Sequence, residues 1–360
     1  MLLKEFGDLP KEIEVYGKKI GEGHPAYIIA EIGNNHNGSL ELAKKSVIAA
    51  HMAGADAVKF QRRTLSEVFT KELLAQPQTS SRSLGTTYGE YRKNQELDDK
   101  SLERVKNLAH QLGLAFFVTA FDVKGVETLD KIGMDAWKIS SFDATHPDLL
   151  VAVAKKGQPI FLSTGMTTLE ERDETIKTIL KYNKNLIIKH CVSIYPTPNT
   201  DLNLGAVKTL KDRYAPLPVG YSGHEVGFVP TVAAVALGAK TVERHFTIDK
   251  SLPGPDHSTV SLDSLEFAQM VREIRRVEMG VADARVYLHD GEIKHQQKHG
   301  KSIVAKVPIL VGSVISQNDI AFKSTGKGGI KPTLAHTVIG KKAKVDLEPD
   351  TVINADEHLI

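Results

Sequence analysis

The sequence has a single cysteine and no long apolar run. Cys191 is the only cysteine among 360 residues, so the chain cannot form an intrachain disulfide bond. We expect Cys191 to be a buried apolar residue at the end of a strand, and a reducing cytoplasm fits this cysteine usage best. No run of about 18 apolar residues occurs, so the sequence predicts no transmembrane helix.

The sequence also lacks an excess of charge of one sign. Its 46 basic and 44 acidic residues give a net charge of +2 and are mixed along the chain, which argues against nucleic acid or an anionic membrane as a partner. The first residues, MLLKEFGDLPKEIEV, lack a secretory pattern. We therefore expect a cytoplasmic globular protein with one large domain and one small domain.

Eight short apolar runs alternate with amphipathic segments in the first 250 residues. Most runs are too short for helices and show no period-two alternation, which is typical of parallel strands covered on both faces. Eight strand–helix repeats predict an α/β protein with a (β/α)8 TIM barrel. The runs are Tyr27–Ile32, Asp56–Phe60, Ala115–Thr119, Ala136–Ile139, Pro159–Leu162, Leu186–Ile188, Val219–Tyr221 and Thr241–Val242.

The segments between the runs carry helix start and stop signals. Ser39 is a predicted N-cap, with Gly54 ending that helix. Pro147 suits a first helical turn. Thr167 and Glu170 form a predicted capping box.

Polar residues follow every one of the eight runs. In a (β/α)8 barrel the C-terminal strand ends and the loops after them form one mouth, where the chemistry takes place. Proximity to water accounts for one or two polar strand ends, but not for two lysines, two histidines and a glutamate at one mouth. The residues are Glu31, Lys59, Gln61, Thr119, Asp122, Lys138, Ser140, Ser141, Ser163, Thr164, His190, Ser193, Tyr195, Ser222, His224, Glu243 and His245.

His224 and His245 end successive predicted strands. Their side chains would project the same way and could hold one divalent metal, with water or substrate completing its shell. The alternative is that each is an ordinary polar residue of the core. A turn-rich segment, Pro253–Pro255, then presents Asp256 and His257.

The domain boundaries follow from composition and from an internal repeat. We predict the barrel at 1–280, a polar linker at 281–299 and a small β-rich domain at 300–360. Within the small domain, Val304–Ala321 aligns with Lys342–Leu359 at an offset of 38 residues, which indicates two pseudo-symmetric halves. Between the halves, Lys323–Pro332 is a basic, glycine-containing loop. An insertion, Thr64–Leu97, is expected to cover part of the mouth.

Eight ordered motifs resemble one known family. AEIGNNHNGSLELAKK, VKFQ, KISSFD, STGM, HCVSIYPTP, GYSGH, ERHFT and GPDH resemble the sialic-acid synthases, which comprise N-acetylneuraminate synthase and its relatives. The resemblance implies a (β/α)8 barrel followed by an antifreeze-protein-like (SAF) domain, in a domain-swapped homodimer. It also implies the condensation of phosphoenolpyruvate with N-acetylmannosamine or a related amino-sugar aldose.

The resemblance assigns roles to matching positions. His224 and His245 match ligands of Mn²⁺ or Mg²⁺, although imidazole chemistry alone would also accept Zn²⁺ or Co²⁺. Glu31 matches a residue that handles protons, and Glu243 either orients Lys59 or a metal-bound water, or forms a structural ion pair. The implied phosphoenolpyruvate contacts are Lys59, Thr119, Lys138, Ser141, Ser163, Ser193 and Ser222. The implied sugar-site residues are Gln61, Phe121, Tyr195 and Asp256.

One position departs from the family pattern. Many bacterial members carry arginine, proline and glycine where this chain has Ser324, Thr325 and Gly326. Lys323 and Lys327 flank the gap, and we take them as candidate sugar contacts. The branch that uses N-acetylmannosamine 6-phosphate also tends to lack that arginine, and the TYGE and GYSGHE segments resemble it, so the phosphorylation state of the sugar stays open.

Two other readings remain. One is a different phosphoenolpyruvate-dependent 3-deoxy-ulosonate synthase, although such enzymes lack this C-terminal domain. The other is a sugar- or ice-binding protein with a decayed barrel, against which the intact set of Glu31, Lys59, Lys138, His224 and His245 argues.

Overall fold

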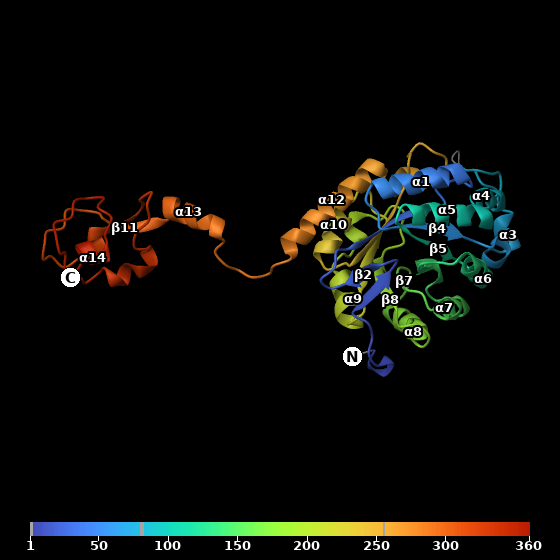
Figure 1. Cartoon of the computed structure of the whole chain (residues 1–360), viewed down its shortest axis with the longest axis horizontal. Coiled ribbons are helices and arrows are strands. Elements are labelled where there is room, and N and C mark those ends of the chain that lie inside the picture. Colours follow the sequence, from blue (N-terminus) through green and yellow to red (C-terminus); the bar gives the residue numbers. More distant parts are fainter. Residues whose placement is uncertain (1–2, 80–82, 255) are drawn as a thin grey trace. The chain divides into compact units, whose positions relative to one another are not determined.

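In the computed structural model, eight parallel strands close into a barrel (Figure 1). The structure describes residues 3–79, 83–254 and 256–360, except for the side chains of Asp256 and His257. The chain divides into two units, Met1–Ala282 and Asp283–Ile360. The segment predicted as a linker contains a helix, α13 (Asp290–His299).

The predicted (β/α)8 barrel is confirmed. Each of the eight apolar runs forms a strand, and the last strand pairs with the first to close the sheet in the order β10-β3-β4-β5-β6-β7-β8-β9. The strands are β3 (Tyr27–Gly33), β4 (Ala57–Arg62), β5 (Ala115–Ala120), β6 (Trp137–Ile139), β7 (Ile160–Ser163), β8 (Leu186–Cys191), β9 (Val219–Gly223) and β10 (Thr241–His245).

The helices that surround the strands begin largely where their capping residues predict. Ser39 Oγ accepts a hydrogen bond from the Leu42 N–H at the start of α1, and Gly54 follows its end with φ +87°. The barrel-unit helices are α1 (Leu40–Met52), α2 (Leu65–Val68), α3 (Lys71–Leu74), α4 (Tyr88–Asn94), α5 (Asp99–Gln111), α6 (Val123–Ile132), α7 (Pro147–Ala154), α8 (Leu169–Leu180), α9 (Ala206–Tyr214), α10 (Val229–Ala236), α11 (Asp256–Thr259) and α12 (Ser264–Val281).

The predicted capping box of α8 is wrong by one residue. The structure places it at Thr168 and Glu171, with both reciprocal hydrogen bonds formed. Thr167 is not available, because its hydroxyl donates to the Thr164 carbonyl 2.9 Å away. The tertiary course of the preceding loop thus selects between two adjacent threonines that are equivalent as caps.

An N-terminal hairpin supplies apolar side chains to one end of the barrel. Strands β1 (Glu12–Val15) and β2 (Lys18–Gly21) pair antiparallel. Their buried residues Ile13, Val15 and Ile20 form one cluster with barrel residues near the strand starts, among them Tyr27, Ile29, Ala57, Ala115, Phe117, Ala136, Phe161 and Ile187. The N-terminal end of the barrel is therefore filled with apolar side chains, which leaves the opposite end for polar groups.

The same strands change character toward their C-terminal ends. Successive side chains of a strand point to opposite faces, so the face that carries Ile29 also carries Glu31, and the face that carries Ala57 also carries Lys59. On the outward face, residues such as Ile28 pack against the helices in a separate core. Each strand therefore contributes apolar residues to the closed end and polar residues to the mouth.

The insertion between β4 and α5 is ordered in its described part. It contains α2, α3 and α4, and Thr87 caps α4 by accepting a hydrogen bond from the Glu90 N–H. Phe69 and Tyr88 make an edge-to-face ring contact at 5.3 Å between centroids. This packing fixes α4, from which Arg92 enters the pocket described below.

The second unit is built from two related halves, as the repeat predicts. Val304 bridges Val352, the residue 38 positions after Val314. Gly312 and Asp350, which are also 38 residues apart, both adopt positive φ, at 81° and 70°. The unit has its own apolar core. Its remaining elements are β11 (Lys301–Ala305), β12 (Ile320–Ser324) and α14 (Ala355–His358).

Short 3-10 turns complete the structure. They are Lys4–Phe6, Ser141–Asp143, Asn199–Asp201, Gln317–Asp319 and Pro332–Thr337.

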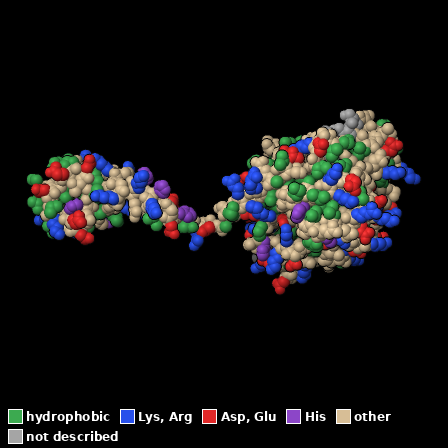
Figure 2. Space-filling model, turned by 45° about the horizontal axis from the view of Figure 1, so that its top comes forward, with side chains coloured by type: hydrophobic (Ala, Val, Ile, Leu, Met, Phe, Trp, Pro, Cys, Tyr) green, Lys and Arg blue, Asp and Glu red, His purple; other side chains and the backbone are tan. Residues whose placement is uncertain are grey.

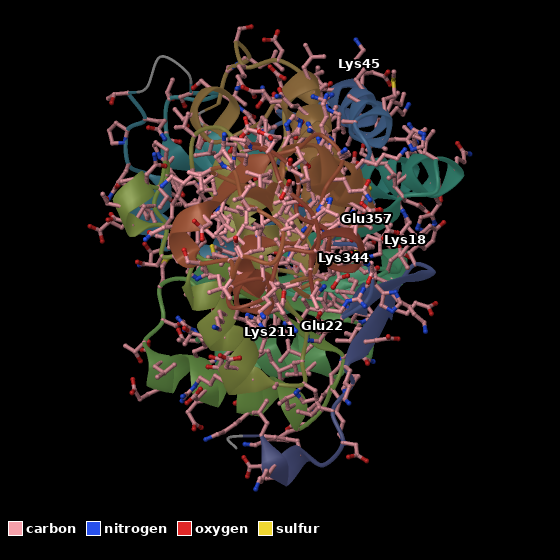
Figure 3. All side chains as sticks on the ribbon, turned by 90° about the vertical axis from the view of Figure 1, so that its left-hand side faces the viewer. Lys18, Glu22, Lys45, Lys211, Lys344 and Glu357 are labelled. Carbon is pink, nitrogen blue, oxygen red and sulfur yellow. The ribbon has the colours of Figure 1, made fainter. Side chains whose placement is uncertain are left out.

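Charged side chains are interspersed on the face of the barrel unit seen in Figure 2. One exposed pair, Lys211 on α9 and Glu22 after β2, joins the hairpin to the barrel with Nζ 2.5 Å from the carboxylate (Figure 3). Within the described ranges, none of the helices has the length and apolar character to span a bilayer.

Candidate active site

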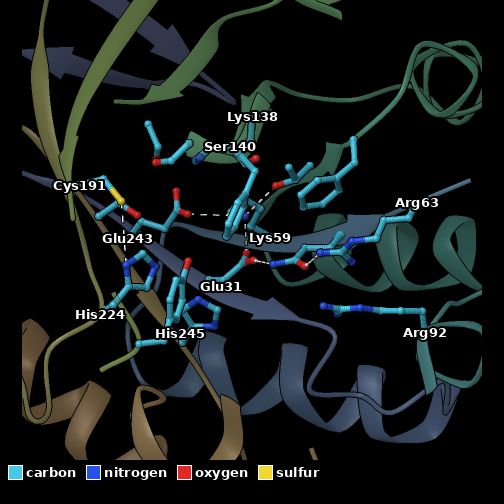
Figure 4. Close-up of a pocket in the computed structure, with 18 residues that line it drawn as sticks. Glu31, Lys59, Arg63, Arg92, Lys138, Ser140, Cys191, His224, Glu243 and His245 are labelled. Carbon is cyan, nitrogen blue, oxygen red and sulfur yellow. Dashed lines mark hydrogen bonds and ion pairs between the residues drawn. The ribbon is translucent and has the colours of Figure 1, made fainter. Parts of the chain in front are cut away.

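A pocket opens at the C-terminal ends of the barrel strands (Figure 4). It contains most of the residues singled out from the sequence, because they share the inward face of their strands or lie in the loops after them. The predicted residues that line it are Glu31, Lys59, Gln61, Thr119, Phe121, Lys138, Ser141, Ser163, Tyr195, Ser222, His224, Glu243 and His245.

Lys59 lies at the centre of a buried polar network. Its Nζ is 2.6 Å from Glu31 Oε2 and 2.8 Å from Thr119 Oγ1. It is also 3.5 Å from Glu243 Oε1. Gln61 Nε2 donates to Glu31 Oε1 over 2.6 Å, so both oxygens of the Glu31 carboxylate have a defined partner.

Glu243 is paired with lysines, including one that the sequence reasoning did not select. Lys189 on β8 places its Nζ 2.6 Å from Glu243 Oε2 and 4.6 Å from the ring centroid of Phe161. The neighbouring Arg244 points the other way and pairs with Glu225 at 2.7 Å. The ion pair considered for Glu243 is thus made with Lys189 and Lys59, not with Arg244.

The two buried carboxylates have opposite proton affinities. Burial raises the pKa of Glu31; the attraction of Lys59 opposes this shift, and the charge of Glu243 adds to it. Burial also disfavours ionised Glu243, but the attraction of Lys189, Lys59 and Lys138 outweighs it and holds the pKa of Glu243 well below its usual value. Glu243 is therefore a fixed anion, whereas Glu31 is able to hold a proton.

The lysines are affected by the same burial. Burial lowers the pKa of Lys138, and it lowers the pKa of Lys189 to about 8 despite the attraction of Glu243. Lys138 Nζ donates to the Ile139 carbonyl over 2.9 Å. Its other two donor positions remain for a ligand, since an ammonium group has three.

Serine hydroxyls meet around Gly165 beside these lysines. The Gly165 N–H donates to Ser141 Oγ over 3.1 Å. A Cβ at position 165 would lie 2.6 Å from Ser193 Oγ and 2.9 Å from Ser141 Oγ, so only glycine permits this approach. Ser163 Oγ is buried and has no hydrogen-bond partner among the described residues, which suits a hydroxyl that waits for a ligand.

His224 and His245 lie side by side, with ring centroids 5.4 Å apart. His224 Nδ1 is 3.0 Å from the Val192 carbonyl oxygen, so Nδ1 carries hydrogen and Nε2 is left as the donor atom for a metal. Burial, followed by the charges of His224 and Lys59, keeps the pKa of His245 well below its usual value. Its imidazole is therefore neutral, as a metal ligand must be.

The imidazoles therefore fit a divalent cation that takes two protein nitrogens and completes its shell with water or substrate oxygens. Among the described residues no group of three His, Cys, Asp or Glu side chains gathers at one point. Asp256 was predicted for this end of the site. Its backbone begins α11, but its side chain lies outside the described residues.

Cys191 is buried, as predicted, and it also lines the pocket. Its Sγ lies 3.9 Å from His224 Nδ1 and 3.8 Å from Ser193 Oγ. Burial disfavours the thiolate, but the charge of His224 and its hydrogen bond lower the pKa of Cys191 to about 7. The thiol and His224 thus form a coupled pair, and a metal on His224 would replace the imidazolium proton of that pair.

Three other predicted residues lie elsewhere. Ser193 is outside the pocket lining, although its hydroxyl contacts Cys191. Lys323 and Lys327 belong to the second unit, where Lys323 Nζ pairs with Asp350. Their predicted role as sugar contacts stays a prediction.

The sequence reasoning missed two arginines. Arg63 and Arg92 line the pocket and enter it from the side opposite Cys191 and Glu243 (Figure 4). For Arg63 a signal was available, because it follows Lys59 and Gln61 at the same period of two. Arg92 lies in a segment recognised as ordered, but its direction depends on how α4 packs.

Comparison with known proteins identifies the family. The NeuB family model matches residues 46–285, and the SAF domain model matches residues 300–357. The chain belongs to the NeuB family. This confirms the resemblance to sialic-acid synthases and the antifreeze-like C-terminal domain that was expected with it.

Individual NeuB relatives cover nearly the whole chain. N-acetylneuraminate-9-phosphate synthase from Homo sapiens is 36% identical over 96% of this chain and 96% of its own length. N,N'-diacetyllegionaminic acid synthase from Legionella pneumophila is also 36% identical, over 93% and 95%. The solved N-acetylneuraminic acid synthetase from Leptospira borgpetersenii, in complex with citrate, has TM-score 0.70 and 32% identity, covering 81% of this chain and 98% of that one.

Proposed function

We propose that this NeuB-family protein is a transferase that condenses phosphoenolpyruvate with N-acetylmannosamine or a related amino-sugar aldose. The products are a nine-carbon 2-keto-3-deoxy sugar acid and orthophosphate. The observation that carries the proposal is the gathering of two lysines, free serine hydroxyls, a protonatable carboxyl and paired imidazoles in one barrel mouth.

Phosphoenolpyruvate carries a phosphate and a carboxylate, which need cations and hydroxyl donors. Lys59 and Lys138 supply the charge. The hydroxyls of Thr119, Ser141 and Ser163 surround them, with Ser193 and Ser222 nearby. The unpartnered Ser163 Oγ supports this assignment, because a bound oxyanion would satisfy it.

The reaction balances with water as the third reactant. C3 of the enol bonds to the aldehyde carbon, whose oxygen takes a proton to become a hydroxyl. Water adds at C2, and the C2–O bond to phosphate then breaks as the C2 carbonyl forms. Glu31 serves as the general acid or base, because its raised pKa lets it both hold and accept a proton at working pH.

A divalent metal is part of the proposal. His224 and His245 would hold it, and Mn²⁺ or Mg²⁺ suits the oxygen ligands that complete the shell. When bound, such an ion polarises an aldehyde oxygen and acidifies a coordinated water. Glu243, held as an anion by Lys189, fixes the position of Lys59 beside Glu31.

The remaining parts of the proposal concern assembly and compartment. We infer a domain-swapped homodimer in which Lys323 and Lys327 of the SAF domain approach the sugar site of the other chain. The absence of paired cysteines favours the cytoplasm. Tyr195, Phe121, Gln61 and Asp256 complete the proposed sugar site.

A phosphate-release assay tests the activity. The purified chain is incubated with phosphoenolpyruvate, Mn²⁺ and one aldose at a time: N-acetylmannosamine, its 6-phosphate, or a 2,4-diacetamido sugar. Erythrose 4-phosphate and arabinose 5-phosphate represent the other 3-deoxy-ulosonate synthases. Release with an amino sugar supports the proposal. Release only with the short phosphorylated aldoses, or with none of the five, contradicts it.

A further inference from the structure

The pocket has a second cationic region that the proposed chemistry does not use. Arg63 follows β4, and Arg92 projects from α4 of the insertion toward Glu31 and His245 (Figure 4). Neither is near the serines proposed for phosphoenolpyruvate in that view. Two guanidinium groups on one wall of a pocket call for a ligand group of opposite charge.

Arg63 is held in place mainly by neutral groups. Its Nη1 donates to Asn34 Oδ1 over 2.8 Å, and its Nη2 donates to Gln61 Oε1 over 2.6 Å. Its guanidinium lies 3.9 Å from the ring centroid of Phe121. Arg63 is only 9% exposed, so its position is fixed, and its paired carboxylate, Glu96, is no closer than 3.7 Å.

Arg92 has only neutral partners. Its Nε donates to the Tyr88 hydroxyl over 2.9 Å, and its Nη1 is 3.4 Å from Gln95 Oε1. The guanidinium lies 5.1 Å and 5.3 Å from the ring centroids of Tyr88 and Tyr91. None of the carboxylates in the described ranges forms an ion pair with it. The charge of Arg92 is therefore oriented but not neutralised.

The two arginines repel each other. Burial lowers the pKa of Arg63, and the charge of Arg92 is the next largest cause. The nearby Glu96 offers limited compensation, because burial raises its pKa against the attraction of Arg63. An anion between the two guanidinium groups would remove this repulsion.

The position of the arginines indicates which part of a ligand they meet. Glu31, Gln61 and Arg63 form a continuous row, in which Gln61 donates to Glu31 and accepts from Arg63. An aldose whose reacting carbon lies at Glu31 would extend along this row with its far end at Arg63. The lysines at the inner end are left for phosphoenolpyruvate, so the arginine end meets the second substrate.

We propose that Arg63 and Arg92 bind a phosphate group on the aldose, at the end remote from its aldehyde carbon. This inference rests on the proposed condensation and selects a phosphorylated amino sugar as its substrate. Guanidinium groups form paired, charge-assisted hydrogen bonds to phosphate oxygens, and two of them match the charge of a phosphate monoester dianion. The relative that is named for a 9-phosphate product is consistent with such a substrate.

Substrate selectivity provides the first test. The quantity measured is the ratio of kcat/KM for N-acetylmannosamine 6-phosphate to kcat/KM for N-acetylmannosamine. We expect the wild-type ratio to exceed 1 and Arg92→Met to lower it about 10- to 100-fold, as the loss of a charge-assisted contact predicts. Lys93→Met is the matched control, because Lys93 is exposed on the same helix; it should leave the ratio unchanged.

Arg63→Lys tests the other half of the subsite while keeping its charge. A lysine lacks the planar fork, so the ratio should fall here too, provided that thermal melting shows an intact fold. A wild-type ratio of 1 or below would overturn the inference. So would an Arg92→Met chain whose KM for phosphoenolpyruvate rises while the ratio stays constant, since the arginines would then serve phosphoenolpyruvate.

Calorimetric binding of N-acetylmannosamine 6-phosphate separates this inference from the condensation itself. Binding that Arg92→Met weakens at least tenfold, and Lys93→Met does not, supports the phosphate subsite even if no aldose releases phosphate from phosphoenolpyruvate. In that case the proposed reaction fails and the subsite stands. Binding that is equal in wild type and Arg92→Met, or no binding to wild type, overturns the subsite whatever the assay shows.

Discussion

At the scale of single residues, burial and neighbouring charge give chemically identical side chains different roles. Glu31 and Glu243 both contact Lys59, yet only Glu243 also pairs with Lys189. That extra cation makes Glu243 a permanent anion and leaves Glu31 as the carboxyl that exchanges protons. Three predictions follow at this scale.

Replacing Lys138 by Met should raise the KM for phosphoenolpyruvate about 10- to 100-fold. The ammonium group has two donor positions free after its bond to Ile139, and a lost charge-assisted hydrogen bond costs roughly 1.5–3 kcal/mol. Steady-state kinetics at saturating aldose measures the effect. If Lys59→Met and Lys138→Met both leave this KM unchanged, phosphoenolpyruvate binds elsewhere.

Lys189 should make stability depend on pH in the alkaline range. Its pKa is about 8 in the folded chain, against 10.5 for an ordinary lysine, so between these values the unfolded chain binds more protons. The free energy of unfolding contributed by this group therefore rises as the pH increases from about 8 to about 10.5.

Lys189→Met removes that contribution. Urea unfolding at pH 8, 9 and 10 should show the wild type gaining stability relative to the variant as the pH rises. Lys181→Met, at an exposed position, serves as the control and should show a constant difference. A constant difference for Lys189→Met as well would mean that Lys189 titrates normally.

The paired imidazoles predict dependence on a divalent metal. Exhaustive chelation should abolish phosphate release, and Mn²⁺ or Mg²⁺ should restore it. His245→Ala should prevent both the restoration and the binding of Mn²⁺ measured by calorimetry. His190→Gln is a control, because His190 contacts the Leu202 carbonyl and not the pocket. Full activity of the metal-free wild type would refute the metal site.

At the scale of secondary-structure elements, the local sequence specifies helix ends to within about one residue. Serine, threonine and aspartate caps mark α1, α4, α5 and α12, where the structure shows the expected hydrogen bonds. At α8 two adjacent threonines compete. The loop hydrogen bond of Thr167 decides between them, and that bond depends on the backbone at Thr164, which local propensity does not reveal.

Thr168→Ala should lower the free energy of unfolding by about 1 kcal/mol, because it leaves an N–H of the first turn without a partner. Thr168→Ser keeps the hydroxyl and should be nearly neutral. Thermal or urea unfolding measures both. An equal loss for the two variants would show that the methyl group, and not the cap, stabilises this end of α8.

At the scale of the whole molecule, the C-terminal unit is small enough that we expect it to need a docking surface. Its basic loop Lys323–Gly329 suits a mouth that binds anions. We predict that the loop completes the active site of the other chain in a dimer. A chain with Glu31→Gln could then lend its loop to a chain that lacks residues 323–327.

Mixing these two inactive variants should restore part of the activity, and only in the heterodimer. Tagged purification after subunit exchange isolates that species. The control is each variant exchanged with itself, which should remain inactive. No recovery after verified exchange would indicate that each loop serves its own barrel, and a fully active monomer in solution would exclude the arrangement in trans.

The sequence by itself determined the barrel, the inward set of polar residues and the family. Strand positions follow from apolar runs, and a period of two places Glu31, Lys59 and Lys138 on the inner face once the sheet closes. These features depend on spacing along the chain, which the sequence states directly. The eight motifs lie within the same strands and loops.

Only the tertiary structure decided the partners of those residues. Lys189 was hidden in an apolar run, and its pairing with Glu243 follows from the distance between β8 and β10 across the barrel. Arg92 reaches the pocket because α4 packs through Phe69 and Tyr88, which are remote from the strands in sequence. Proton affinities likewise depend on burial and on charges from several strands, quantities that arise only when the barrel closes.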